Sequence, residues 1–394
     1  MKFSISRDSL VKSLNLVAGV VERRQTLPIL ANVLVVLEDD RLSLTGTDLE
    51  VELVGRVQLA AAGDSGEITV PARKLLDICK SLPEGSDIDF QAKDSKVSIK
   101  SGRSRFTLAT LPAREFPNVE DSIGTHQLTL KQGQLRRLID RTGFAMAQQD
   151  VRYYLNGMLW EISDKQQLRV VATDGHRLAM CTLPERVKVN GEGATQVILP
   201  RKGVLELARL LMEDDADIAI IIGSNHIRAA TDDFTFTSKL VDGKFPDYQR
   251  VLPRSPDKIL MGSRQELRQA FTRTAILSNE KYRGVRLKLT QDTLDIVANN
   301  PEQEEAEETV SVEYSGDALE IGFNVSYLLD VLGVLSGEQV KLSLADPNSS
   351  ALRFPLCCYA DASVAERVPI KYRLTPRLRL LAERARAVRP CAQT

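Results

Sequence analysis

The sequence predicts an α+β protein made of three tandem copies of one domain. An apolar strand followed by an amphipathic helix recurs at Phe3–Val21, Leu128–Ala147 and Ile259–Leu277. The first helical leucines, Leu10, Leu135 and Leu267, stand 125 and 132 residues apart. A period of that length corresponds to a whole domain. We therefore expect three related domains, each with helices on one face of a sheet.

Composition narrows the class of protein. The 394 residues are 43% hydrophobic and 27% charged, which is ordinary for a globular chain with packed cores. No apolar stretch approaches the roughly 20 residues of a membrane span, and the polar start MKFSISRDSL is unlike a signal peptide. The five cysteines show no metal-ligand spacing and no disulfide framework. We expect a cytoplasmic protein with no metal, no cofactor and no membrane partner.

Charge is unevenly distributed along the chain. Residues 353–394 hold nine Lys or Arg and three Asp or Glu, a net charge of +6, so residues 1–352 carry −7 of the total of −1. An acidic body argues against a protein that coats nucleic acid with its whole surface. A single basic face on the protein is still compatible with this overall charge.

Each copy opens with a helix that has one apolar stripe, for example Leu10, Leu14, Val17 and Val21 in the first copy. A hairpin with alternating polar and apolar residues follows. It closes on a polar pair in every copy: Thr47-Asp48, Thr173-Asp174 and Asn299-Asn300. We expect this pair to begin a turn, because Asp and Asn bond their own backbone.

The second half of each copy has another strand and helix. The first two copies end on matching Phe-Pro pairs, at Pro117 and Pro246, which places linkers near residues 118–127 and 247–256. The predicted domains are residues 1–126, 127–254 and 255–352, followed by an atypical basic tail at 353–394. The third copy lacks a recognisable closing strand, so we expect an open sheet edge there.

The run from Thr173 to Arg177 suggests catalysis, since Asp174 and His176 could act as base and orienter. The histidines lie far apart in sequence, and no acidic cluster or Walker-type loop accompanies them. A turn is therefore favoured over a nuclease or deaminase centred on His176.

Five of the six predicted helices are rich in Lys and Arg, which favours a positive face that contacts phosphates without reading sequence. The acidic run from Glu302 to Glu308 has a basic counterpart, Arg103-Ser104-Arg105, in the first domain. These opposite patches permit head-to-tail association, which closes a ring if the rotation is right.

Several long motifs carry a family resemblance. They include LSLTGTDLE, QQDVRYYLNGM, VATDGHRLA, FTSKLVDGKFPDY, AILSNEKYRGVRL and ANNPEQEEAEE. Over residues 1 to about 352 the chain closely resembles the bacterial sliding clamp, the beta subunit of DNA polymerase III. The resemblance implies the DNA-clamp (processivity) fold and a ring-shaped homodimer that encircles duplex DNA without an active site of its own.

The resemblance also implies residue roles. DNA contacts fall on Arg24, Arg73, Gln149, Tyr153 and Tyr154. The subunit contact falls on Lys74, Arg103, Arg105, Phe106 and Leu108 of one chain, against Ile276, Leu277, Glu302 and Glu305 of the other. A pocket for partner peptides falls on Leu155, Thr173, Gly175, His176, Arg177, Leu178, Pro246, Arg250, Val251, Asn324, Tyr327 and Ser350. The implied partners are the polymerase alpha subunit, the clamp-loader delta subunit and other proteins with clamp-binding motifs.

The chain departs from the family after about Leu352. Members of the family end on an apolar strand and a Met/Pro-rich tip that forms one wall of the pocket, and residues 353–394 match neither. A frameshift and a lineage-specific tail both explain this ending. We expect weak binding of partner peptides. The alternative function is a monomeric peptide-binding scaffold that does not close around DNA.

Overall fold

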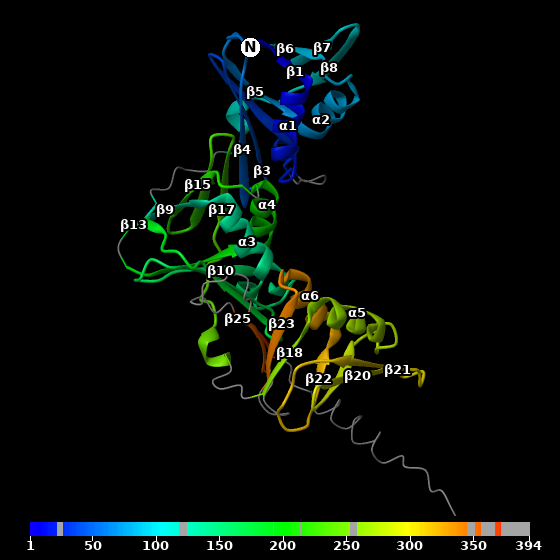
Figure 1. Cartoon of the computed structure of the whole chain (residues 1–394). Helices are drawn as coiled ribbons and strands as arrows, with labels where there is room; N and C mark the ends of the chain where they lie inside the picture. The colour runs from blue at the N-terminus through cyan, green and yellow to red at the C-terminus, as the bar shows by residue number, and fades with distance from the viewer. Residues whose placement is uncertain are drawn as a thin grey trace, which may run out of the picture. The chain divides into compact units, whose positions relative to one another are not determined.

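The computed structural model describes residues 1–21, 27–117, 124–191, 193–212, 214–252, 258–344, 351–355 and 367–371. The chain divides into two compact units. The first unit comprises residues 1–137, 161–167 and 186–243, and the second comprises residues 138–160, 168–185 and 244–394. Figure 1 shows the helices and strands of both units.

Nearly the same order of elements occurs three times along the chain, with β13 as an additional strand in the second copy. The first copy holds β1 (Lys2–Ser6), α1 (Arg7–Ala18), β2 (Asn32–Glu38), β3 (Arg41–Thr47), β4 (Val51–Gln58), β5 (Gly66–Pro71), α2 (Ala72–Ser81), β6 (Asp87–Lys93), β7 (Lys96–Ser101) and β8 (Ser104–Ala109). The second holds β9 (His126–Lys131), α3 (Gln132–Thr142), β10 (Gly157–Ile162), β11 (Leu168–Thr173), β12 (Leu178–Thr182), β13 (Lys188–Asn190), β14 (Thr195–Pro200), α4 (Arg201–Leu210), β15 (Asp217–Ile222), β16 (His226–Ala230) and β17 (Phe234–Lys239). The third holds β18 (Lys258–Ser263), α5 (Arg264–Ala275), β19 (Gly284–Thr290), β20 (Thr293–Asn299), β21 (Glu305–Ser311), β22 (Leu319–Asn324), α6 (Val325–Val334), β23 (Gln339–Leu344), β24 (Ala351–Pro355) and β25 (Arg367–Lys371).

The first helix of each copy buries the predicted stripe. Leu10, Leu135 and Leu267 are all buried, with at most 1% of each residue exposed. Serine caps begin two of these helices, since Ser6 Oγ accepts the N–H of Ser9 and Ser263 Oγ accepts that of Glu266. A hydroxyl at this position satisfies one of the N–H groups that a helix start leaves unpaired. The predicted first helices are confirmed.

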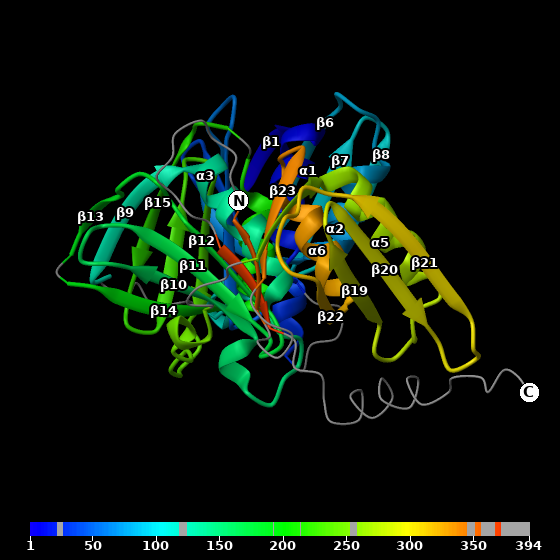
Figure 2. The ribbon, with the colours of Figure 1, turned by 60° about the horizontal axis from the view of Figure 1, so that its bottom comes forward.

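Strand pairing joins neighbouring copies into common sheets. In the first unit, the order β13-β9-β15-β16-β17-β4-β3-β2-β5 unites strands of the first and second copies. The junction is the antiparallel pair β17–β4, in which Phe236 lies opposite Leu53. A second sheet, β1-β6-β7-β8, ends on β8. The second unit has the sheet β21-β20-β19-β22, with α5 against β20 and β21 (Figure 2).

Residues beyond Leu352 contribute backbone to the third copy. The strands follow the order β12-β25-β24-β23-β18, with Met180 opposite Arg367 and Ser343 opposite Arg353. The expectation of an open sheet edge is therefore wrong. Strands pair through backbone N–H and C=O groups, which an atypical sequence supplies as well as a familiar one. The boundary expected at residue 352 falls inside β24.

An arginine joins the two helices of every copy at one end. Arg7 Nε donates to Cys79 O at 3.1 Å, Arg136 Nη1 to Ala208 O at 2.7 Å, and Arg264 Nη1 to Leu332 O at 3.2 Å. Each acceptor lies two residues before the last residue of the second helix. We call Arg7, Arg136 and Arg264 the helix-end arginines.

The helix-end arginines donate hydrogen bonds to carbonyl groups that are left unpaired at the end of a helix. The last four carbonyls of a helix lack an intrahelical partner, and the dipole makes that end negative. Each guanidinium also bonds a second carbonyl near the same helix end, that of Lys80, Leu211 or Gly337. These arginines therefore stabilise the helix pair and are only partly exposed.

No helix among the described residues is long and apolar enough to span a bilayer.

Arg264→Met should lower the thermal midpoint, because the carbonyls of Leu332 and Gly337 lose a charged donor. The expected loss is about 1–3 kcal/mol. The matched control is Arg268→Met on the exposed side of the same helix, which should change stability by less than about 0.5 kcal/mol. Calorimetry of both variants measures the difference. Equal shifts would contradict the structural role of Arg264.

Candidate functional site

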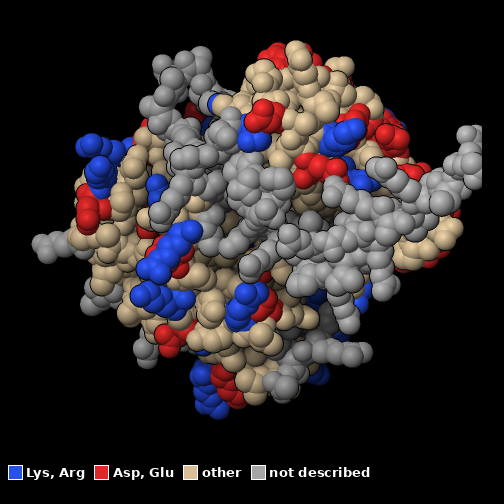
Figure 3. Space-filling model, turned by 90° about the horizontal axis from the view of Figure 1, so that it is seen from below, with Lys and Arg blue, Asp and Glu red and all other residues tan. Residues whose placement is uncertain are grey.

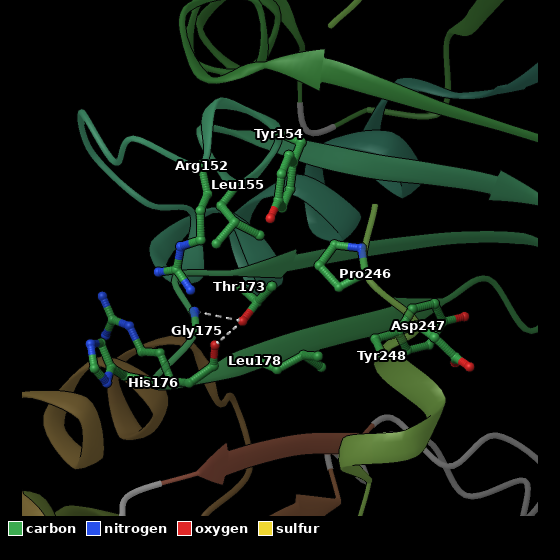
Figure 4. Close-up of a pocket in the computed structure, with 11 residues that line it drawn as sticks. Arg152, Tyr154, Leu155, Thr173, Gly175, His176, Leu178, Pro246, Asp247 and Tyr248 are labelled. Carbon is green, nitrogen blue, oxygen red and sulfur yellow. Dashed lines mark hydrogen bonds between the residues drawn. The ribbon is translucent and has the colours of Figure 1, made fainter. Parts of the chain in front are cut away.

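A pocket in the second unit gathers most of the residues that were predicted to bind partner peptides (Figure 4). Its cavity measures about 190 Å³. The lining residues are Arg152, Tyr154, Leu155, Thr173, Gly175, His176, Arg177, Leu178, Pro246, Asp247 and Tyr248. They come from three places: the segment before β10, the turn between β11 and β12, and the segment that follows the second copy.

The turn between β11 and β12 is fixed by its own side chains. Thr173 Oγ1 donates to Arg177 O at 2.6 Å and accepts the N–H of Gly175 at 3.1 Å. Asp174 Oδ1 accepts the N–H groups of His176 and Arg177 at 2.8 and 2.9 Å. The prediction that the polar pair begins a turn is confirmed.

The first and third copies repeat this chemistry. Thr47 Oγ1 donates to Val51 O, and Asp48 Oδ1 accepts the N–H groups of Glu50 and Val51. In the third copy, Asn300 Oδ1 accepts the N–H of Glu304. The turn is thus a feature of the domain, and in the second copy it lines the pocket.

Catalysis at His176 finds no support in this geometry. The Asp174 carboxylate is occupied by backbone N–H groups and by Arg177 Nε at 3.2 Å, so it does not orient the imidazole. Within the described ranges, no group of three or more His, Cys, Asp or Glu could hold a metal ion.

Arg152 ties the loop before β10 to the pocket turn. Its Nε and Nη2 donate to the two carboxylate oxygens of Asp150 at 2.9 and 2.7 Å, and Nη2 also reaches Asp174 O at 3.1 Å. Hydrogen bonds from the Arg152 guanidinium and backbone N–H lower the pKa of Asp150 to about 2. Asn156 closes the same loop by bonding both backbone groups of Asp150.

Three described residues of the predicted pocket set, Arg250, Asn324 and Tyr327, do not line this cavity. Arg250 is highly exposed and pairs with Asp247 at 2.8 Å. Asn324 caps α6 by accepting the N–H of Ser326, and Tyr327 lies on the Arg177 guanidinium. Ser350 and the side chain of Val251 lie outside the described residues.

The sequence did not lead us to predict four of the lining residues as part of this pocket. Arg152, Asp247 and Tyr248 were not predicted, and Tyr154 was assigned to DNA. A signal existed, since Asp247 and Tyr248 directly follow the Phe-Pro pair that ends the second copy.

The predicted DNA contacts are dispersed in the chain. Arg73 is exposed in the first turn of α2, and Gln149 and Tyr153 are exposed in the loop before β10. Tyr154 packs edge-on against Tyr153, with ring centroids 5.8 Å apart. Arg24 lies outside the described residues.

The predicted subunit contacts lie on or beside the strands β8 and β21 and on or after the helices α2 and α5. Arg103 and Arg105 are exposed at β8, and Phe106 and Leu108 on the same strand are half-buried. After α5, Ile276 is 75% exposed, and Leu277 beside it is half-buried. Glu302, Glu305 and Lys74 are exposed. Both β8 and β21 are terminal strands of their sheets within the described structure.

Several Lys and Arg side chains of the basic helices bond protein groups, so fewer of them are available to contact phosphates than the composition predicts. The helix-end arginines point to carbonyls, Arg209 donates to Asn15 O and Leu16 O, and Lys202 pairs with Asp48. Arg273 pairs with Glu308. Figure 3 shows Lys and Arg beside Asp and Glu on the face it presents. The predicted positive face is therefore reduced to exposed cations such as Arg73, Lys74, Lys80 and Arg268.

Three family models match consecutive parts of the chain. Models of the DNA polymerase III beta subunit match the chain in three consecutive parts: the N-terminal domain at residues 1–120, the central domain at 129–247 and the C-terminal domain at 249–355. Three tandem clamp domains define a DNA polymerase processivity clamp. The chain belongs to the DNA polymerase III beta subunit family.

Relatives support the same assignment. The beta sliding clamp of Pseudomonas aeruginosa is 66% identical over 352 residues, which cover 89% of this chain and 95% of that protein. The Escherichia coli beta sliding clamp is 55% identical over 350 residues, or 89% of this chain and 94% of that protein. The function is therefore that of a sliding clamp, in preference to the monomeric scaffold.

Solved structures agree with the fold. A crystal structure of the Pseudomonas aeruginosa DNA polymerase sliding clamp with ligand matches with a TM-score of 0.89 at 61% identity, covering 95% of this chain and 100% of that chain. A sliding clamp from Bartonella birtlesii bound to griselimycin matches with a TM-score of 0.87 at 38% identity, covering 95% and 99%.

Gly175→Ala should release Arg152 from Asp150. A Cβ at Gly175, whose φ is +86°, would lie 2.8 Å from Arg152 Nη1, and the flexible guanidinium would move. The pKa of Asp150 should then rise from about 2 toward its ordinary 3.8. Because the folded pKa is the lower one, the pair stabilises the loop above pH 3.8 and is lost as the pH falls through 2. Titration of Asp150 by NMR measures this.

The control for Gly175→Ala is Gly85→Ala. Gly85 has a similar φ of +71° with no atom within 4 Å of the added Cβ. Both variants should lose about 1–2 kcal/mol through the left-handed backbone, and the Asp150 pKa should be unchanged in Gly85→Ala. An unchanged pKa in Gly175→Ala would rule out the close approach of Arg152.

Proposed function

We propose that two copies of this chain associate head to tail into a ring that encircles duplex DNA and tethers the replicative polymerase. The observation that carries this proposal is the complementarity of two terminal strands. β8 is an edge strand of the first copy with basic and apolar side chains. β21 is an edge strand of the third copy with an acidic sequence, EAEETVS.

The proposed subunit contact combines three interactions. Backbone groups of β8 and β21 extend a sheet from one subunit into the next. Phe106 and Leu108 meet Ile276 and Leu277, which removes apolar surface from water. Lys74, Arg103 and Arg105 face Glu302 and Glu305, which orients the association and excludes the like-charged alternatives.

DNA is held mainly by enclosure in this proposal. Arg24, Arg73, Gln149, Tyr153 and Tyr154 offer charge, amide and phenol donors to phosphates, which gives contact without sequence preference. Few helical cations remain free, because the helix-end arginines, Arg209, Lys202 and Arg273 have protein partners. Weak phosphate attraction suits a ring that must slide.

The pocket serves partner proteins. A tethered polymerase rebinds at high effective concentration, which is the origin of processivity. The polymerase alpha subunit, the clamp-loader delta subunit and other proteins with clamp-binding motifs would insert short peptides beside Leu155, Thr173, Gly175, Leu178 and Pro246. The chain acts in the cytoplasm as part of the DNA polymerase III holoenzyme and has no active site of its own.

Retention on DNA tests the ring. The clamp is loaded on nicked circular plasmid with excess clamp loader, and the plasmid is then cut. The chain should stay on the circle and leave the linear product, because only enclosure holds it. Ile276→Lys should abolish retention by placing charge in the subunit contact. Ile259→Lys, at another exposed isoleucine (44% exposed), should not. Equal retention on circular and linear DNA would refute enclosure.

Residues 353–394 should weaken the pocket, because the apolar, Met/Pro-rich ending of the family is absent. Replacing them with the family ending should raise the affinity for a labelled polymerase-derived peptide about tenfold or more, by restoring an apolar wall. Fluorescence anisotropy of both chains measures it. If the chain as it stands already binds as tightly as the chimera, the altered ending has no effect on partner binding.

A further inference from the structure

The guanidinium of Arg177 is occupied by protein groups although the residue lines the pocket. Nε donates to Asp174 Oδ2 at 3.2 Å, Nη2 donates to Phe144 O at 2.7 Å, and Nη1 donates to Asp330 Oδ2. The cation also lies over the ring of Tyr327, 4.6 Å from its centroid, and over the ring of Phe144 at 5.3 Å. Its side chain is only 13% exposed.

This enclosure limits what Arg177 can offer a ligand. An arginine has five N–H donors in one plane, and partners on three sides of that plane hold its orientation. The Arg177 side chain therefore shapes the turn from Asp174 to Arg177, and with it the pocket wall at Gly175 and His176.

Helix α6 supplies two of these partners. Tyr327 and Asp330 are three residues apart, so they lie on the same face of the helix. The opposite side of α6 is fixed in the third copy, where Leu328, Val331 and Leu332 are fully buried. Arg177 thus connects a turn of the second copy to a rigid helix of the third.

We infer that Asp330 is a positioning residue for partner binding, an inference that rests on the proposed function of the pocket. Asp330 does not line the cavity, and its side chain is 44% exposed. It acts through Arg177: its carboxylate holds Nη1, which keeps the turn in the binding geometry before a peptide arrives. Loss of the carboxylate removes one of the partners that hold the guanidinium, which loosens the turn, so peptide binding must order the pocket wall at a cost in affinity.

The test compares Asp330→Asn, Arg177→Met, the double variant and Glu320→Gln. Glu320 is a matched control, because it is also 44% exposed and pairs with an arginine, Arg286, at 3.7 Å. Affinity is measured by anisotropy with a labelled peptide from the polymerase alpha subunit. Asp330→Asn should bind about three- to tenfold more weakly, whereas Glu320→Gln should match the unmodified chain. Asp330→Asn and Glu320→Gln should keep the thermal midpoint within about 2 °C. Arg177→Met should lower it, because Phe144 O and the Asp174 carboxylate lose a charged donor.

The double variant should bind no more weakly than Arg177→Met, since Asp330 acts only through Arg177. Fully additive losses would overturn the inference, and so would an Asp330→Asn affinity equal to that of the unmodified chain.

Hydrogen exchange of the unliganded chain separates this inference from the proposed function. Asp330→Asn should speed exchange at the amides of Gly175, His176 and Arg177, which are bonded within the turn, while Glu320→Gln should not. Faster exchange in a chain that binds no peptide would support the Asp330–Arg177 linkage and reject the peptide function. Unchanged exchange would overturn the linkage itself.

Discussion

Pairing of strand edges is the constraint on which the rest of this structure depends. An exposed strand presents unpaired N–H and C=O groups that must find partners. Within the chain, neighbouring copies satisfy one another: β17 pairs with β4, and β24 and β25 stand between β12 and β23. Within the described residues, β8 and β21 are two of the terminal strands of the sheets, and their side chains carry opposite charge. Strand pairing already joins neighbouring copies within one chain. In the proposed ring, the same kind of pairing joins one chain to a second chain.

The way the two helices pack is repeated in every copy, and it reduces the number of arginine side chains that could contact DNA. Each copy carries two helices joined at one end by a helix-end arginine. The three arginines contact the same point of the second helix, but they occupy different sequence positions in the first helix. Arg7 and Arg264 begin their helices, while Arg136 lies one turn further along α3. A cation that satisfies helix carbonyls cannot also neutralise a phosphate. The proposed ring would therefore hold DNA loosely.

Much of the fold could be predicted from the sequence, because periodicity and turn chemistry are local. The stripe at Leu10 and the turn at Asp174 needed no knowledge of distant residues. The inward role of Arg264 depends on Leu332, which is 68 residues away, so counting basic residues overestimated the positive face. Arg152 and Tyr248 line the same pocket although they are far apart in the sequence. Only the tertiary fold brings them together, so sequence patterns could not predict it. β25 was missed because backbone pairing, which composition does not reveal, places it in the sheet.

In the proposed ring, β8 of one chain pairs with β21 of another. Hydrogen exchange by mass spectrometry, at a concentration where sedimentation equilibrium gives the mass, tests it most directly. The proposed dimer should have twice the chain mass of 43.7 kDa, and the backbone amides of β8 and β21 should be protected in the dimer and exposed on dilution to monomer. A monomer at micromolar concentration, or a dimer in which these two strands exchange freely, would contradict it.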